Sequence, residues 1–387
     1  MRKRISSVVP LCMISALGAL SAQEPPKGNR IVELMKEYTN APAPPGYEGP
    51  VRDLLVRDLR AGGASVSVDG LGSVIGVVRG QSDRPRIMVD AHMDEVGLMV
   101  QFIRPDGFIS FRTLGGWTDQ ALIDQRWTIL TNKGPVPAVT GGPDDHVWTA
   151  KQLAGLIPRS EIFLDVGASS KEDVIRLGIR PGDLIAPASP FTVLTNNRYL
   201  AKAWDDRVGC LIMLEVLRKF KELGITPPNT IYFVGTTQEE LGERGAQTAV
   251  QSVKPDIGIA LEVGIAGDVP SVVPEQSQER LGEGPAIFLY EDTMIPHRKL
   301  RDFFLNVAAE KKIALQTEVL TGSFGQDGTE IQRFDTGRPT ICLAVPTRYT
   351  HGHGSVIDLK DFDRAVDLLV EILIRLNAGT VSEISKF

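Results

Sequence analysis

Apolar segments that alternate with helical segments constrain the fold of this chain more than any other feature. Strands of buried type are indicated at residues 86–92, 230–235, 257–261 and 340–345. Helical periodicity is found at residues 208–223 and 246–253, and a closing helix is indicated at 359–376. Near-continuous apolar strands separated by helices predict an α/β fold whose sheet is covered on both faces.

A second kind of pattern interrupts this alternation between about residues 97 and 190. Short β-type runs at 98–103, 108–112, 127–131, 138–140 and 161–166 are separated by glycine and proline turns. This spacing is typical of a small barrel or sandwich. Since the α/β pattern begins before this stretch and resumes after it, we predict a discontinuous domain of residues 23–96 and 191–387 with residues 97–190 inserted into it.

The first 22 residues have the pattern of a secretory signal peptide. Arg2, Lys3 and Arg4 precede an apolar run at 8–20, and Ala22 is a plausible cleavage position. The apolar run is too short to cross a bilayer. We therefore predict a periplasmic or secreted protein whose mature form has no membrane span. Cys210 and Cys342 would then remain, and because both lie in apolar runs, we expect buried free thiols.

The charge balance argues against two classes of partner. The 387 residues include 42 Lys plus Arg and 48 Asp plus Glu, a formal net charge of -6. This balance supplies no general electrostatic attraction to nucleic acid or to an anionic membrane. We expect neither as a partner.

Polar clusters follow several of the predicted strands, at the edge where open α/β sheets bind ligands. In the first cluster, His92 and Asp94 are two residues apart and point to the same side of an extended chain. Asp94 could therefore hold one ring nitrogen of His92 while the other nitrogen binds a metal. Taken alone, such a pair is more often only structural.

The other clusters are also ambiguous one by one. Asp205 and Asp206 precede a helix, where carboxylates favour the helix N-terminus, and Glu239 and Glu240 could belong to a solvated first helical turn. Further polar residues at strand ends are Glu262, His351 and His353. Together the clusters supply the histidines and carboxylates that two zinc-like ions with one bridging carboxylate require.

Five motifs in this order resemble the M42 family of dinuclear metallo-aminopeptidases. They are A-H-M-D-E-V-G from residue 91, A-W-D-D-R-V-G from 203, Q-E-E-L-G-E-R-G-A from 238, the single acid Glu262, and R-Y-T-H from 348. Further stretches, such as Leu114-Gly-Gly-Trp117, also match. The resemblance covers about residues 30 to 376.

The resemblance implies a role for each of these residues. His92, Asp205 and Glu262 would bind one metal, and Asp205, Glu240 and His351 the other, with Asp205 as the bridge. Glu239 would be the general base, and Asp94 would orient His92. The R-Y-x-H pattern favours His351 over His353. In related metallopeptidases the peptide bond after the bridging Asp is cis, so the Asp205–Asp206 bond is a candidate for that geometry.

The same resemblance implies a mixed-sheet metallopeptidase domain with an inserted small β-barrel that serves dimerisation. Peptides would be the substrates, and Gln326 and Asp327, in a loop near the substrate pocket, would contact them. Two divalent cations per subunit are implied, with zinc first and cobalt or manganese also suited to nitrogen and oxygen ligands. Family members assemble into homo-oligomers as large as dodecamers.

Glu262 departs from the family pattern, which usually has Asp at this position. Glutamate keeps the carboxylate but lengthens the arm by one methylene. In the neighbouring M20 family this Asp/Glu choice resembles a divide between aminopeptidases and carboxypeptidases. The main hypothesis is therefore an exopeptidase that hydrolyses the N-terminal residue of peptides. The alternatives are an M20-like carboxypeptidase or N-acyl deacylase, and a non-catalytic metal- or peptide-binding homologue.

Overall fold

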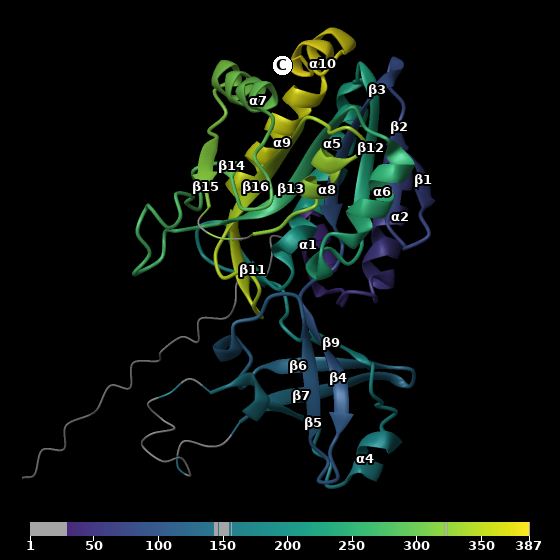
Figure 1. Cartoon of the computed structure of the whole chain (residues 1–387), viewed down its shortest axis with the longest axis vertical. Helices are drawn as coiled ribbons and strands as arrows, with labels where there is room; N and C mark the ends of the chain where they lie inside the picture. The colour runs from purple at the N-terminus through teal and green to yellow at the C-terminus, as the bar shows by residue number, and fades with distance from the viewer. Residues whose placement is uncertain are drawn as a thin grey trace, which may run out of the picture.

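An eight-stranded mixed sheet forms the centre of the larger part of the molecule in the computed structural model (Figure 1). The structure describes residues 29–142, 146, 155, 157–320, 322 and 324–386. The strands, in their order across the sheet, are β1 (Ser65–Val68), β2 (Val74–Val78), β12 (Asn229–Thr236), β3 (Ser82–His92), β13 (Ile257–Ile265), β16 (Thr340–Thr347), β14 (Ala286–Tyr290) and β15 (Gln316–Val319). The four central strands β12, β3, β13 and β16 are parallel, so their carboxyl ends meet at one edge.

Helices cover both faces of this sheet. One face carries α1 (Arg30–Asn40), α2 (Gly49–Gly62), α5 (Trp204–Leu223), α7 (Arg298–Lys311) and α9 (Leu359–Leu373), and the other carries α6 (Arg244–Val253) and α8 (Gly328–Arg333). Because successive strand side chains point to opposite faces, Ile87 and Val89 of β3 join the first core while Met88 joins the second. The predicted α/β class with both faces covered is confirmed.

The β-rich stretch folds into a closed barrel below the sheet (Figure 1). Its strands, in order around the barrel, are β4 (Gly97–Ile103), β5 (Ile109–Leu114), β8 (Phe163–Asp165), β7 (Gly134–Gly141), β6 (Arg126–Thr131) and β9 (Leu184–Pro187). The pattern of short runs left barrel and sandwich open, whereas the resemblance implied a barrel. The barrel is confirmed, and β9 closes it by pairing with both β4 and β6. Four residues ending in proline carry too little periodicity to predict such a strand.

The remaining elements connect and extend these two parts. They are η1 (Asp119–Ala121), η3 (Arg159–Glu161), α4 (Lys171–Arg176), β10 (Thr192–Val193), β11 (Arg198–Ala201), η4 (Glu239–Leu241), β17 (Ser355–Asp358) and α10 (Ala378–Ile384). Strands β10, β11 and β17 form a small separate sheet. Helices α7 and α10 lie at the end of the large sheet that is remote from the barrel (Figure 1).

Two smaller expectations concern the thiols and the membrane. Cys210 and Cys342 are both buried and free, as predicted. Within the described ranges, no helix is both long enough and apolar enough to cross a membrane.

Candidate metal centre

The register of the central strands brings His92, Glu262 and the turn after β12 to one edge of the sheet. His92 pairs with Thr236, the last residue of β12, and Glu239 and Glu240 follow in η4. Ala260 of β13 pairs with Asp90 of β3. Glu262 and His92 are therefore each two residues further along neighbouring parallel strands, on the same face.

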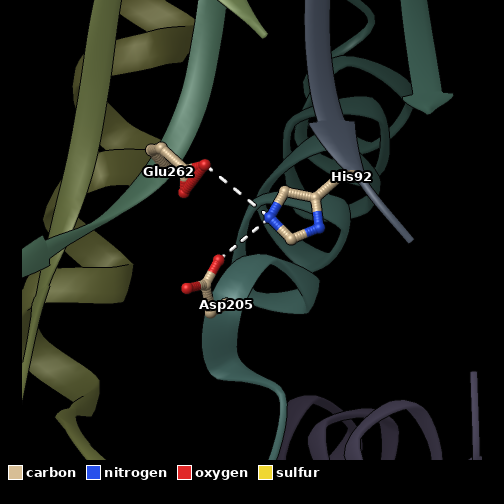
Figure 2. Close-up of side chains that lie close together, drawn as sticks. All are labelled: His92, Asp205 and Glu262. Atoms are coloured by element: carbon tan, nitrogen blue, oxygen red, sulfur yellow. Dashed lines mark hydrogen bonds and ion pairs between the residues drawn. The ribbon is translucent and has the colours of Figure 1, made fainter. Parts of the chain in front are cut away.

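Figure 2 shows the first group of possible metal donors, in which the carboxylates of Asp205 and Glu262 approach the His92 ring. His92 Nε2 lies 2.9 Å from Asp205 Oδ1 and 3.7 Å from Glu262 Oε1. His92 and Glu262 are almost completely buried. One imidazole nitrogen and two carboxylates thus converge in a buried corner.

The second group uses the other oxygen of Asp205. His351 Nε2 lies 3.2 Å from Asp205 Oδ2 and 3.5 Å from Glu240 Oε2. Asp205 therefore faces His92 with one oxygen and His351 with the other, which is the arrangement a bridging carboxylate needs. The peptide bond between Asp205 and Asp206 is cis, as the resemblance led us to expect.

His353 lies away from both groups. Its Nε2–H donates to the Arg126 carbonyl at 3.0 Å, and its ring packs edge-on against Trp127 at 4.3 Å between ring centroids. Burial lowers the pKa of His353 to about 4, so the ring is neutral near pH 7. The structure thus places His351, and not His353, beside the carboxylates.

Asp94 holds the His92 ring by a main-chain hydrogen bond, and its carboxylate lies only at ion-pair distance from that ring. His92 Nδ1–H donates to the Asp94 backbone carbonyl at 3.1 Å, whereas the nearest approach of the carboxylate to Nδ1 is 3.8 Å. The carboxylate instead accepts the backbone N–H groups of Glu239 and Glu240, at 3.0 and 3.2 Å. Asp94 thus fixes the ring through its main chain and the η4 turn through its side chain.

A buried ion network anchors the segment that carries Asp205. Glu95 accepts from Lys202 Nζ at 2.5 and 2.7 Å and from Arg207 at 3.0 Å. Arg207 also donates to the carbonyls of Tyr38 and Ala41 at the end of α1. Removing one partner of such a buried network typically costs about 3–5 kcal/mol, because the other charge is left uncompensated. Asp205 therefore lies between two residues, Lys202 and Arg207, that are held firmly in place.

The buried carboxylates of the site make the binding of positive charge favourable. Burial and the charge of Asp205 raise the pKa of Glu262 well above its usual range. Burial likewise raises the pKa of Glu240 to about 8, although the charge of His351 opposes the shift. Glu240 Oε1 is buried and has no hydrogen-bond partner among the described residues. Divalent cations bind imidazole nitrogen and carboxylate oxygen atoms, and their charge would offset the cost of burying these carboxylates.

A cavity of about 410 Å³ opens onto both groups. It is lined by Gly116, Asp205, Glu239, Glu240, Gly242, Glu243, Glu262, Ile265, Phe324, Gly325, Thr350 and His351. Glu239 Oε2 is 3.8 Å from His92 Nε2, close to the donor atoms without belonging to either donor group. Burial and the charge of Glu240 raise the pKa of Glu239 well above its usual range.

The structure places Gln326 and Asp327, the predicted substrate-binding residues, behind the wall of the cavity and not on it. Both side chains are buried, and neither lines the cavity. Asp327 accepts a hydrogen bond from Thr236, and Gln326 binds the backbone N–H of Gly328 and the sulfur of Met294. Their neighbours Phe324 and Gly325 form the cavity wall instead, because the chain turns inward into α8 after Gly325.

The barrel supplies a part of the site that sequence reasoning did not assign. Gly115 and Gly116 follow β5, and a Cβ atom on Gly115 would lie 2.7 Å from Glu240 Oε2. A Cβ atom on Gly116 would lie 3.0 Å from His351 Nδ1. The matched stretch Leu114-Gly-Gly-Trp117 was the available signal, but only the folded chain shows which side chains these glycines approach.

Nitrogen and carboxylate donors that converge beside a cavity at the carboxyl ends of parallel strands are the arrangement expected of a metal-dependent hydrolase. Residues 72–368 match the family described as M42 glutamyl aminopeptidase, and the chain belongs to this family. FrvX of Escherichia coli (strain K12) is 36% identical over 358 residues, which are 92% of this chain and 98% of FrvX.

Solved structures agree with this assignment. The TET aminopeptidase from a marine sediment archaeon, Thaumarchaeota archaeon SCGC AB-539-E09, has a TM-score of 0.89 and 38% identity, covering 92% of this chain and 99% of that one. The TET1 peptidase of Pyrococcus horikoshii, described as assembling into a tetrahedron or a large octahedral shell, has a TM-score of 0.78 and 27% identity, covering 89% and 100%. The chain therefore has a mixed-sheet domain with an inserted small barrel, and it belongs to the aminopeptidase class of peptide hydrolases. M42 aminopeptidases are metal-dependent enzymes.

The comparisons contradict the prediction of a periplasmic or secreted protein. The related TET and FrvX peptidases are cytosolic. The prediction depended on residues 1–22, which lie outside the described residues. A basic N-terminal segment followed by an apolar run is too general a pattern to determine the cellular location of a protein.

Gly115→Ala is expected to lower kcat/KM by about tenfold to hundredfold, because small displacements of catalytic groups have effects of this size. The new methyl group would press on Glu240 and also on Val96. Gly167→Ala is the matched control, since Gly167 has a φ of 75°, close to the 80° of Gly115, and open space around it. Both variants should lose about 1–2 kcal/mol of stability from the left-handed backbone. Equal losses of activity in the two variants would contradict a role of Gly115 at the site.

Proposed function

We propose that this protein removes N-terminal residues from peptides with the help of two divalent cations. The observation that carries the proposal is the placement of Asp205, whose two oxygens face His92 and His351 separately. His92, Asp205 and Glu262 would hold one cation, and Asp205, Glu240 and His351 the other. Zinc suits this mixture of nitrogen and oxygen donors, and cobalt or manganese are the other candidates.

Within this proposal, Glu239 is the general base. When bound, the cations would polarise the scissile carbonyl and lower the pKa of the attacking water. Glu239 lines the cavity and would accept a proton from that water. It would then donate the proton to the leaving amine, so that one carboxylate serves first as base and then as acid. Asp94 supports this role by binding the backbone N–H of Glu239.

We further propose that residues 23–96 and 191–387 form the catalytic domain and that residues 97–190 contact a second subunit. The assembly described for the P. horikoshii relative supports a homo-oligomer, from a dimer to a dodecamer or larger. The barrel is also placed to complete each site, because Gly116 lines the cavity from the barrel side.

The experiment that tests the reaction compares free and N-acetylated peptides of the same sequence. With added Zn²⁺, Co²⁺ or Mn²⁺, we expect hydrolysis of the free-amine peptide, little hydrolysis of the acetylated one, and loss of activity in a chelator that returns when metal is restored. Preference for the acetylated peptide would favour the deacylase or carboxypeptidase alternative, with Glu262 as the first residue to examine. Metal binding without hydrolysis of any peptide would favour a non-catalytic homologue.

A further inference from the structure

Glu243 is a charged residue of the cavity wall that the proposed chemistry does not use. It follows the η4 turn, and its backbone N–H donates to the carbonyl of Glu239 at 2.9 Å. Glu243 therefore lies one turn beyond the proposed base. A Cβ atom on Gly325 would lie 3.0 Å from Glu243 Oε1, so the carboxylate extends to the opposite wall of the cavity.

The Glu243 carboxylate lacks a cationic partner. Its side chain is half-buried and forms no hydrogen bond or ion pair within the described part of the chain. The charge of Arg333 acts to lower the pKa of Glu243, but the Arg333 guanidinium pairs with Glu330 at 3.6 Å. A partly desolvated, unpaired anion on a cavity wall is a favourable partner for a cationic group that enters the cavity.

The rest of the cavity wall determines what kind of cation fits. Among the described residues that line it, none is Lys or Arg, and the one histidine, His351, belongs to the proposed metal site. An acidic side chain in the cavity would therefore have no cation of the wall to pair with and would face Glu243. Ile265 and Phe324 add apolar surface to the same cavity. Such surface accommodates the methylene stem of a long basic side chain whose charge lies at its end.

We propose that Glu243 selects peptides whose N-terminal residue is basic, lysine or arginine, by pairing with the charged end of that side chain. The proposal rests on the proposed aminopeptidase function and names its preferred substrate class. It departs from the glutamyl preference in the description of the family, because a glutamyl side chain would be repelled by Glu243. Glu243 would act on the first side chain of the substrate and not on the scissile bond.

The test uses lysyl, norleucyl and glutamyl p-nitroanilides with the metal-loaded enzyme. Norleucine has the same chain length as lysine without the terminal charge, so the ratio of kcat/KM for the two isolates the effect of charge. We expect wild type to favour lysyl over norleucyl by about tenfold or more, the range of a hydrogen bond to a charged group, and to use glutamyl least. Glu243→Gln should bring the lysyl-to-norleucyl ratio close to one, and Glu243→Asp should retain part of it.

Two controls separate this proposal from its alternatives. Glu291→Gln removes a nearby charge that does not line the cavity and forms no ion pair within the described residues, and it should keep the ratio; an equal fall would show a general field effect and overturn the proposal. A loss shared equally by lysyl and norleucyl substrates in Glu243→Gln would mean that Glu243 binds the α-amine, and would also overturn it.

A binding measurement keeps the proposal testable if no substrate is hydrolysed. Calorimetry with L-lysine and L-norleucine, on wild type and Glu243→Gln, should show tighter binding of lysine only to wild type. Absence of hydrolysis together with this preference would refute the proposed reaction and retain the selectivity. Hydrolysis with equal use of lysyl and norleucyl substrates would retain the reaction and refute the selectivity.

Discussion

Asp205→Ala is expected to abolish hydrolysis and to lower bound metal from the proposed two equivalents per subunit to one or fewer. Asp205 Oδ1 is 2.9 Å from His92 Nε2, and Oδ2 is 3.2 Å from His351 Nε2. Removing the side chain would therefore take one donor from each proposed cation. Elemental analysis of the purified, metal-loaded variant beside wild type measures the loss directly.

The neighbouring Asp206 offers the matched control. Its Oδ1 accepts the backbone N–H of Gly209 at 3.0 Å, a bond that an amide oxygen can also accept. Asp206→Asn should therefore keep both equivalents of metal. Full metal content in an inactive Asp205→Ala would contradict the bridging role, and metal loss in Asp206→Asn would transfer that role to Asp206.

Glu239→Gln is expected to lower kcat by about 10²–10⁴-fold, the usual contribution of a general base, or roughly 3–5 kcal/mol of transition-state stabilisation. The amide keeps the size of the side chain but cannot accept the proton. Glu239 lies outside the two donor groups, so metal content should remain that of wild type. Steady-state kinetics together with elemental analysis measures both properties.

Glu240→Gln distinguishes the two adjacent acids. Because Glu240 Oε2 lies 3.5 Å from His351 Nε2 within the second donor group, this variant should lose metal as well as activity. A Glu239→Gln enzyme that retains more than about a tenth of wild-type kcat would exclude Glu239 as the base. If Glu239→Gln loses metal while Glu240→Gln keeps it, the two roles are exchanged.

Local sequence patterns were sufficient to predict the four central strands of the sheet and the polar residues at their ends. Strand β3 is a buried run that ends at His92, and β13 carries Glu262 in a run whose first eight residues are all buried. Such runs are read from the sequence because a strand covered on both faces must be apolar throughout. The parallel order of these strands then brings their polar ends to one edge.

Orientation within the site could not be predicted from the same patterns. The spacing of His92 and Asp94 indicated a hydrogen bond between their side chains. In the structure the His92 ring bonds to the backbone carbonyl of Asp94, and the Asp94 carboxylate accepts hydrogen bonds from the backbone of η4. Gln326 and Asp327 were expected at the pocket, but the turn into α8 buries them. Each outcome depends on hydrogen bonds between segments that are distant in the sequence.

The sequence by itself determined the fold class, the inserted β-rich stretch and the family, because periodicity and motifs are local properties of a chain. Only the tertiary structure decided that the barrel closes through β9, that Gly115 and Gly116 approach Glu240 and His351, and that Glu243 lines the cavity. The physical reason is that these features are contacts within the barrel and between the barrel, η4 and the loop before α8. Long-range contacts of this kind form only when the whole chain packs, and no local pattern records them.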